Sequence, residues 1–534
     1  MHLRRDVIHS FAFTFQSPSI TQLKMNIISI ITIFLSIFKF SSSSKILAIF
    51  PSGTKSHDLF TSRIAEELHS RGHNLTILTV YPELYPGMNT IYLKENQEFW
   101  LKFRKDMVAY RGKSSAWERL YHLSDYGYYM AKSTLINKQV QELMKSNQTF
   151  DLILLEEYFN EAFLGFAHIF KSPIVMIRIY ISQATNPTKV GCYDSPSVVP
   201  SVHSKFTDEM SFWERVENTL ISWFEMFVVS HIQIKQQEIL YNEFFSDPKP
   251  SIKDLMKNIS IVLQNTHPST SYVQPKSPNL IEIGGLHISK ERKPLPKEIS
   301  EILDSEENGL IYFALGGNVD FSQFSEEKKS ALLESLKRTN HTVFLKIKGV
   351  QMKRTGNILI NDWFPQNDIL AHPKTKVFIT HGGIQSTYEA VYHAVPILGI
   401  PIYADQPHNV AFAVRKGMGI LLDYEDITEK SVDHALTTIL ENSSFKEKAK
   451  AISKIHHDRQ NTPLETAVYW IEYAIRRKGA AHLKITGIDM GFIQYHSLDV
   501  MALLMLGLTL FTFILYKVFI IICSSCFIRK NKIE

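Results

Sequence analysis

The sequence predicts an α/β protein with two Rossmann-like, doubly wound domains facing a cleft, followed by one C-terminal transmembrane helix. Three observations predict this fold. The chain has 534 residues, and one hydrophobic core rarely grows past roughly 250–300 residues. Short apolar runs alternate with helical stretches in two successive series, as in parallel sheets. A late apolar segment, 500–523, is long enough to cross a bilayer.

The composition excludes several classes of protein. Hydrophobic residues make up 45% and charged residues 21%, which is typical of a globular chain and not of a disordered one. The net charge of +5 gives no dense basic face for nucleic acid. The three cysteines are Cys192, Cys523 and Cys526. Only Cys192 precedes the apolar segment, so we expect neither an intradomain disulfide nor a cysteine-rich zinc site.

The N-terminal region 1–44 is predicted to be a signal peptide region. Its apolar core, Ile27–Phe38, follows Lys24; it has the length of a signal sequence and is too short to span a membrane. The residues before Met25 do not resemble a signal-peptide start, so Met25 is the predicted natural initiator. A buried helix is the alternative interpretation.

The C-terminal region predicts a single-pass type I membrane protein. Lys517 interrupts the apolar segment 500–523, and a lysine away from the bilayer centre can extend toward the interface. The tail 524–534 carries Arg529, Lys530 and Lys532, which favours a cytoplasmic tail and places the bulk of the chain in the lumen.

Two further signals bear on location. Lys530 and Lys532 resemble a dilysine retrieval signal of the endoplasmic reticulum, and ordinary stop-transfer charge is the alternative. Five glycosylation sequons permit a lumenal address without proving it. They begin at Asn74, Asn147, Asn258, Asn340 and Asn442.

The first α/β series spans 45–285. It opens with a predicted strand, Lys45–Phe50, a loop that holds His57, a helix over Leu59–Arg71 and a strand over Asn74–Val80. Further strands are predicted at Leu152–Leu155, Ile174–Ile177 and Ile259–Gln264. The aromatic-rich, amphipathic stretch Met210–Asp247 is predicted to form a lid or, together with Phe60, one wall of a binding site.

The second series spans 286–485, including a predicted return helix, and a juxtamembrane stretch covers 486–499. The charged, proline-containing segment Gly284–Lys297 is predicted to link the two domains. Predicted strands follow at Leu310–Leu315, Val343–Ile347, Ile358–Ile360, Lys376–Thr380 and Pro396–Ile400.

A diphosphate site is predicted at the strand Lys376–Thr380. The turn His381-Gly382-Gly383 follows this strand and precedes a helix over Ser386–His393. A helix N-terminus offers free N–H groups and a positive dipole to an anion, and open α/β sheets bind ligands at this edge. Alone, the same pattern is equally typical of a tight structural turn.

Neighbouring residues favour a nucleotide sugar. Trp363 and Gln366 flank Pro365 and offer an aromatic face and an amide edge to a planar base. Glu389, on the predicted helix, suits the paired hydroxyls of a ribose. Asp405 and Gln406 follow the next strand, where they would meet the hydroxyls of a sugar.

The segment Asn361–Asp423 resembles the signature of the UDP-glycosyltransferase family, which includes the UDP-glucuronosyltransferases. The matching motifs are W-x-P-Q-x-x-x-L-x-H, F-I-T-H-G-G, E-A, V-P and P-x-x-x-D-Q, and they look closer to arthropod members. The resemblance implies a GT-B fold and inverting transfer of a hexose from a UDP-sugar to a small lipophilic acceptor, as in detoxification. UDP-glucose is the favoured donor and UDP-glucuronate the alternative.

The resemblance also implies partners and cofactors. The UDP-sugar is a co-substrate and no cofactor is implied; the chain contains no D-x-D motif, which favours metal-free transfer. A catalytically inactive relative that only binds UDP-sugar is the alternative function. The partners are the UDP-sugar, the acceptor and the membrane, with no nucleic acid, and homo-oligomer formation stays open.

The implied donor-binding roles transfer residue by residue. Trp363 stacks on uracil, and Gln366 bonds its edge. His381, Gly383 and the backbone at Gln385 and Ser386 hold the diphosphate, Glu389 binds ribose, and Asp405 and Gln406 bind the sugar.

The implied catalytic pair lies in the first domain. His57 is the candidate base and Glu156 its carboxylate partner, with Glu157 beside it as an alternative. Three positions depart from residues frequent in the family: Gln385 stands where Asn or a small residue is common, Ala394 replaces a glycine and Gly317 replaces a serine.

Overall fold

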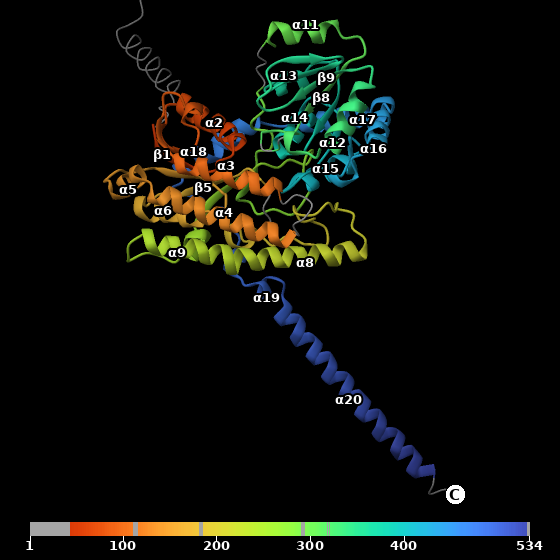
Figure 1. The fold of residues 1–534 in the computed structure, drawn as a ribbon. Coiled ribbons are helices and arrows are strands. Elements are labelled where there is room, and N and C mark those ends of the chain that lie inside the picture. Colours follow the sequence, from red (N-terminus) through yellow and green to blue (C-terminus); the bar gives the residue numbers. More distant parts are fainter. Residues whose placement is uncertain are drawn as a thin grey trace, which may run out of the picture. The chain divides into compact units, whose positions relative to one another are not determined.

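Two seven-stranded sheets form the core of the protein (Figure 1). A computed structural model describes residues 43–109, 116–180, 185–289, 294–317, 319 and 321–530. The predicted signal peptide with Met25, and Lys532 of the predicted retrieval signal, lie outside these described residues.

The first sheet has the order β3-β2-β1-β4-β5-β6-β7, and all its strands are parallel. The strands are β1 Lys45–Phe50, β2 Asn74–Thr79, β3 Asn89–Tyr92, β4 Leu152–Glu156, β5 Ile174–Arg178, β6 Ile259–Gln264 and β7 Leu280–Glu282. Alternate residues of β1 enter opposite hydrophobic clusters, Ile46 and Ala48 on one face and Leu47 and Ile49 on the other. Helices therefore cover both faces, which explains the uninterrupted apolar strands.

The helices of this half pack in two layers. Helix α2 (Lys55–Ser70) and the late helix α18 (Pro463–Arg476) share one cluster, so the chain returns to its first domain before the membrane segment. The others are α3 Lys94–Ala109, α4 Ala116–Ile136, α5 Lys138–Lys145, α6 Gly165–Phe170, α7 Asn186–Lys189, α8 Phe212–Val228, α9 Ile234–Phe244 and α10 Ile252–Lys257.

The second sheet has the order β10-β11-β9-β8-β12-β13-β14, and only β10 runs antiparallel. The strands are β8 Leu310–Ala314, β9 Thr342–Lys346, β10 Lys353–Thr355, β11 Ile358–Asn361, β12 Thr375–Thr380, β13 Ile397–Gly399 and β14 Gly419–Leu421. The helices are α11 Lys297–Ser305, α12 Glu326–Lys337, α13 Gln366–Leu370, α14 Ile384–Tyr392, α15 Gln406–Arg415, α16 Glu429–Glu441 and α17 Ser444–His457. This pair of doubly wound halves confirms the predicted fold class.

The ten predicted strands are all present, and the missed strands are the two edges of each sheet, β3, β7, β10 and β14. Edge strands here are short and partly exposed, so they lack the continuous apolar run of a central strand. One placement was wrong. Helix α2 begins at Lys55, so His57 lies in its first turn and not in a loop.

The stretch predicted as a lid or wall is one long helical segment. A π-helical turn, Val229–Gln233, joins α8 to α9. Such turns interrupt α-helices most often at functional sites, and Val229 and Gln233 both line the central cavity described below.

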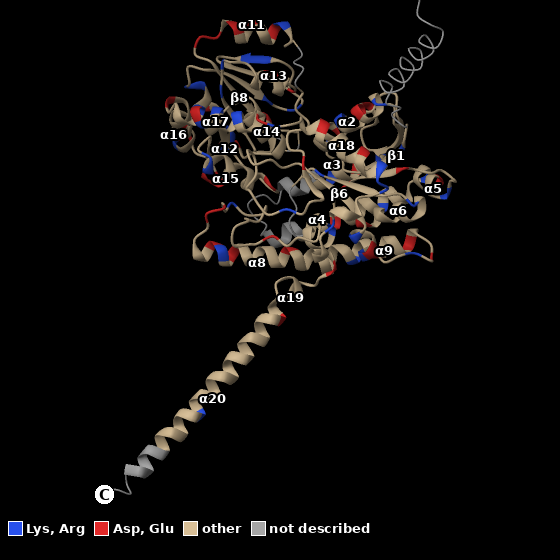
Figure 2. Ribbon diagram, turned by 180° about the vertical axis from the view of Figure 1, so that it is seen from behind, with Lys and Arg blue, Asp and Glu red and all other residues tan. Residues whose placement is uncertain are grey.

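The C-terminal helix α20 spans Leu498–Lys530, and its segment Leu498–Ser524 is long and apolar enough to cross a membrane. Figure 2 shows this helix almost free of charged residues. Before it, the short helix α19 (Phe492–Tyr495) packs on the first domain, where the rings of Tyr193 and Tyr495 are 4.7 Å apart.

Ala394 provides a test of the local backbone. It follows α14 with φ +55°, and a Schellman-type bond from Val395 N–H to Ala390 C=O closes the turn at 2.8 Å. A left-handed conformation strains any residue with a Cβ. We therefore expect Ala394→Gly to raise the free energy of unfolding by about 1 kcal/mol in urea titration, because glycine removes this strain.

The control is Ala331→Gly inside α12, where glycine is expected to cost about 1 kcal/mol. Equal destabilisation by both substitutions would contradict the assignment of strain to Ala394.

Candidate functional site

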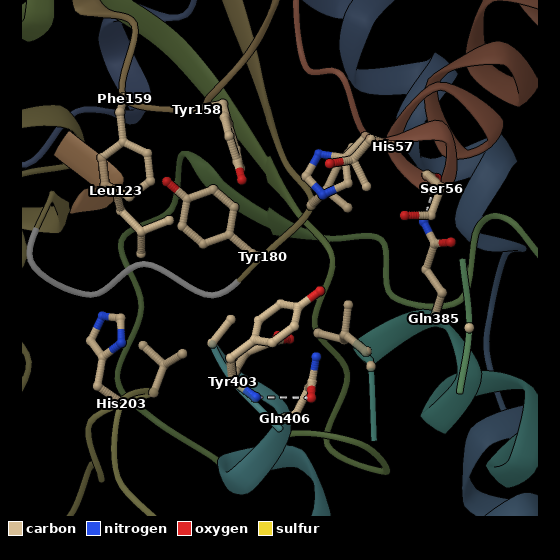
Figure 3. Close-up of a pocket in the computed structure, with 18 of the residues that line it drawn as sticks. Ser56, His57, Leu123, Tyr158, Phe159, Tyr180, His203, Gln385, Tyr403 and Gln406 are labelled. Atoms are coloured by element: carbon tan, nitrogen blue, oxygen red, sulfur yellow. Dashed lines mark hydrogen bonds between the residues drawn. The ribbon is translucent and has the colours of Figure 1, made fainter. Parts of the chain in front are cut away.

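A central cavity of about 210 Å³ lies where residues of the two sheets' carboxyl ends converge (Figure 3). The first half of the chain contributes His57, Tyr158 and Tyr180, and the second half contributes His381 and Asp405. Parallel α/β sheets bind ligands at this edge because successive loops open there.

His57 lines the cavity and is held from behind by Glu156. His57 Nδ1 lies 2.5 Å from Glu156 Oε1, and Glu156 is fully buried at the end of β4. With Nδ1 engaged, His57 Nε2 is the ring nitrogen left to exchange a proton with a ligand. Figure 3 shows the His57 ring at the cavity beside Tyr158, whose ring meets it edge-on.

Glu157 points into a different environment. Its carboxylate accepts hydrogen bonds from Arg178 Nε at 2.8 Å and from Lys189 Nζ at 2.6 Å. Burial alone would raise the pKa of Glu157, but the charges of Arg178 and Lys189 outweigh it and lower the pKa to about 2. Lys189 also pairs with buried Glu161, so the cluster is close to neutral. The structure thus places Glu156, and not Glu157, against His57.

Asp58 is a buried acid next to this pair that the sequence interpretation missed. It accepts hydrogen bonds from Thr79 at 2.5 Å and from Tyr85 at 3.0 Å. Burial raises the pKa of Asp58 well above its usual value, and the charge of Glu156 adds to the shift.

His381 is enclosed by glycines. A Cβ at Gly316 or at Gly383 would lie 2.6 Å from the imidazole, so both positions require the absence of a side chain. Burial, reinforced by the charge of Lys346, lowers the pKa of His381 to about 4, and the ring is neutral at physiological pH.

Helix α14 begins beside His381 with Gly383 as its N-cap, without a side-chain cap hydrogen bond. Its first backbone N–H groups have no partner within the helix. Gln385 also connects the two halves of the chain, because its Nε2 donates to Ser56 C=O at 2.6 Å. Gln385 and Ser386 therefore offer backbone N–H groups next to His57.

Gln366 and Glu389 lie together. Gln366 Nε2 donates to Glu389 Oε2 at 2.5 Å and to Ser386 Oγ at 3.1 Å. Burial raises the pKa of Glu389 to about 7, and the hydrogen bond from Gln366 opposes the shift. Trp363 is 62% exposed and borders a neighbouring cavity of about 670 Å³ together with Lys346.

Asp405 and Gln406 line the central cavity from the start of α15. Asn409 donates to Asp405 Oδ2 at 2.8 Å, and burial raises the pKa of Asp405. Gln406 Oε1 accepts the N–H groups of Ile402 and Tyr403, one of them drawn in Figure 3. The amide nitrogen of Gln406 thus stays available to a ligand.

Several cavity residues were missed by the sequence interpretation. Tyr158 and Tyr180 each lie two residues beyond the end of a strand, a position that the carboxyl-end rule would have selected. His203 and Glu225 gave no such signal. Phe60, expected in the wall of the binding site, lies instead in the hydrophobic core. The face of α2 that carries Phe60 packs against the first sheet.

The two adjacent glutamates are expected to differ in their effect on stability. Because Glu161 still pairs with Lys189, Glu157→Gln leaves one uncompensated positive charge in this buried cluster and should lower the free energy of unfolding by about 3–5 kcal/mol. Glu156→Gln removes no cation's partner and should cost less. Denaturant titration of both variants checks this, and equal losses would contradict the division of roles.

Comparison with known proteins places the chain in a family. The family described as UDP-glucoronosyl and UDP-glucosyl transferase matches residues 44–533. The UDP-glucosyltransferase 2 of Dactylopius coccus is 32% identical over 91% of this chain and 94% of its own length. The human UDP-glucuronosyltransferase 2B15 is 32% identical over 89% of this chain and 93% of its own length.

Solved structures support the fold alone. The glycotransferase of kitacinnamycin superposes with a TM-score of 0.54 at 14% identity, over 82% of this chain and 99% of that chain. The spinosyn forosaminyltransferase SpnP gives 0.52 at 15% identity, over 82% of this chain and 100% of that chain. Because a family match spans nearly the whole chain, the protein belongs to the family of UDP-glucuronosyl and UDP-glucosyl transferases.

Proposed function

We propose that this UDP-glycosyltransferase moves a hexose, preferably glucose, from a UDP-sugar to a hydroxyl of a small lipophilic acceptor, with inversion and without a metal ion. The observation that carries the proposal is the His57–Glu156 pair, which faces the same cavity as His381, Asp405 and Gln406. A general base and donor-binding residues that line one cavity suit a single displacement, in which the acceptor oxygen replaces UDP on the sugar.

In the proposed step, His57 removes the acceptor's proton as its oxygen attacks the sugar. Glu156 holds Nδ1 as the donor nitrogen, so Nε2 is the base, and its charge stabilises the imidazolium that forms. General base catalysis of this kind contributes about 10²–10⁴-fold to the rate.

The departing UDP is stabilised by groups that need no rearrangement. The free N–H groups at the start of α14 and the neutral imidazole of His381 can donate hydrogen bonds to the developing negative charge. Trp363 and Gln366 hold uracil and Glu389 holds ribose in this proposal. Among the described residues, no group of three or more His, Cys, Asp or Glu is arranged to hold a metal.

Two features favour glucose and a lipophilic acceptor. No Arg or Lys occurs among the described residues that line the central cavity, and a glucuronate carboxylate calls for such a cation. The acceptor side is built from Tyr158, Phe159, Tyr180 and Val228, which bind apolar rings.

We also propose the endoplasmic reticulum membrane as its location, with the two α/β domains in the lumen. The apolar helix Leu498–Ser524 and the basic residues after it support this orientation.

A donor panel tests the proposed function. Membranes that contain the full chain are incubated with labelled UDP-sugars and one generic phenol. We expect transfer from UDP-glucose above UDP-glucuronate, with inverted configuration. His57→Ala should lower kcat by about 10²–10⁴-fold without changing the Kd of UDP-glucose. His69→Ala, on the exposed face of the same helix, is the control.

The outcomes separate the alternatives. Binding of UDP-sugar without transfer to any acceptor would favour the inactive relative. Normal transfer by His57→Ala would remove His57 from the role of base.

The pKa of Glu389 predicts a pH dependence of donor binding. Its carboxyl group, with a pKa of about 7, is protonated below that pH and then accepts hydrogen bonds from ribose poorly. We therefore expect the Kd of UDP-glucose to increase as the pH falls from 8 to 6. The diphosphate of UDP-glucose does not titrate in this range, so the change can be assigned to the protein. Glu389→Gln should bind more weakly at high pH and lose this dependence, and an unchanged pH profile would contradict the assignment.

A further inference from the structure

A second histidine–glutamate pair lines the central cavity, and the proposed reaction does not use it. His203 Nε2 lies 3.7 Å from Glu225 Oε1, and both residues border the same cavity as His57. Figure 3 shows His203 across the cavity from His57, with Tyr180 and Tyr403 in the space between them. His203 thus lies across the cavity from the proposed base, with Glu225 next to it.

The side chain of Glu225 is largely buried, and among the described residues its carboxylate forms no hydrogen bond. Glu225 is 5% exposed, and the distance to His203 exceeds that of a hydrogen bond. The described residues provide its carboxylate with no other ion pair. Glu156, by contrast, lies within hydrogen-bond distance of its histidine, at 2.5 Å. A buried carboxylate in this state gains free energy from any ligand that donates to it.

Glu225 also stands out from its neighbours in the cavity. The only other carboxylate among the described lining residues is Asp405, which the proposed function assigns to the donor sugar. Val228 and Val229, close behind Glu225 along the chain, are apolar lining residues. An acceptor that fills this side therefore meets the carboxyl group of Glu225 beside His203, among mainly aromatic and aliphatic side chains.

The local backbone directs Glu225 to this position. It belongs to the last turn of α8, directly before the π-helical turn Val229–Gln233. Gln233, which also lines the cavity, donates hydrogen bonds from Nε2 to the two carboxylate oxygens of Glu161 at 2.8 and 3.0 Å. Glu225 borders two cavities. One is a neighbouring cavity lined by Trp223 and Phe492, and the other is the central cavity, which His203 and His57 also line.

We propose that His203 and Glu225 form a recognition subsite for acceptors with a second hydrogen-bond donor, a hydroxyl or an amine, at the end opposite the hydroxyl that receives the sugar. The inference rests on the proposed function, because it assumes that the acceptor lies between His57 and His203. Glu225 accepts the donated hydrogen, and His203 contributes a ring nitrogen to the same group.

Matched acceptors test the subsite. Full-length protein in membranes is assayed with UDP-glucose and three acceptors: a naphthol, a dihydroxynaphthalene with its hydroxyls on opposite rings, and the naphthol with an aminomethyl group in place of the second hydroxyl. We expect the two bifunctional acceptors to show kcat/KM at least about tenfold above the naphthol, the size of one charge-assisted hydrogen bond.

Two substitutions then distinguish the chemistry. Glu225→Leu should raise KM for both bifunctional acceptors about tenfold and leave that for naphthol unchanged or lower. Glu225→Gln keeps an acceptor oxygen without the charge, so it should retain most of the preference for the diol and lose that for the amine. Should the leucine variant not fold, the glutamine variant still measures the subsite. Glu217→Leu, an exposed glutamate on the same helix, is the control.

The results separate the two levels of inference. Transfer to all three acceptors with equal kcat/KM, or equal changes in KM for all of them in Glu225→Leu, would overturn the subsite and leave the proposed function intact. No transfer to any acceptor by the wild-type protein would overturn both.

Discussion

The contact between His57 and Glu156 depends on the pairing of β1 with β4. These strands are parallel neighbours, with Ile49 opposite Leu155, so the segments that leave their carboxyl ends emerge side by side. His57 and Glu156 are 99 residues apart in the chain, and only this pairing brings them together. The same geometry joins His381, after β12, to Gly316, after β8, because those strands are also neighbours.

Burial on both faces of each sheet determines where charge can lie. The interior of the strands is apolar, so ionisable groups are concentrated at the strand ends, where loops and helix termini supply partners. At the end of β4, the neighbouring residues Glu156 and Glu157 have entirely different partners. Successive residues project to opposite sides, and one carboxylate meets an imidazole at the cavity while the other meets two cations behind it.

The central cavity combines polar groups from the second half of the chain with mainly apolar groups from the first half. Burial shifts the pKa values of His381, which lines the cavity, and of Glu389 toward their neutral forms, so in the proposed function dipoles contribute more than charges to nucleotide binding. In the first half, the π-helical turn between α8 and α9 exposes Val229 and Gln233 to the cavity.

The amino-acid pattern by itself determined the central strands, the glycine turn after β12, the apolar C-terminal helix and the segment that resembles the family signature. These features depend on local information: an apolar run, a glycine at a tight turn, or motif residues close together in the chain. The tertiary structure decided which glutamate faces His57, that Gln385 reaches Ser56, and that His203 and Glu225 share a cavity with the base. Those relations depend on strand register and on packing between segments far apart in the chain, and no local pattern encodes them.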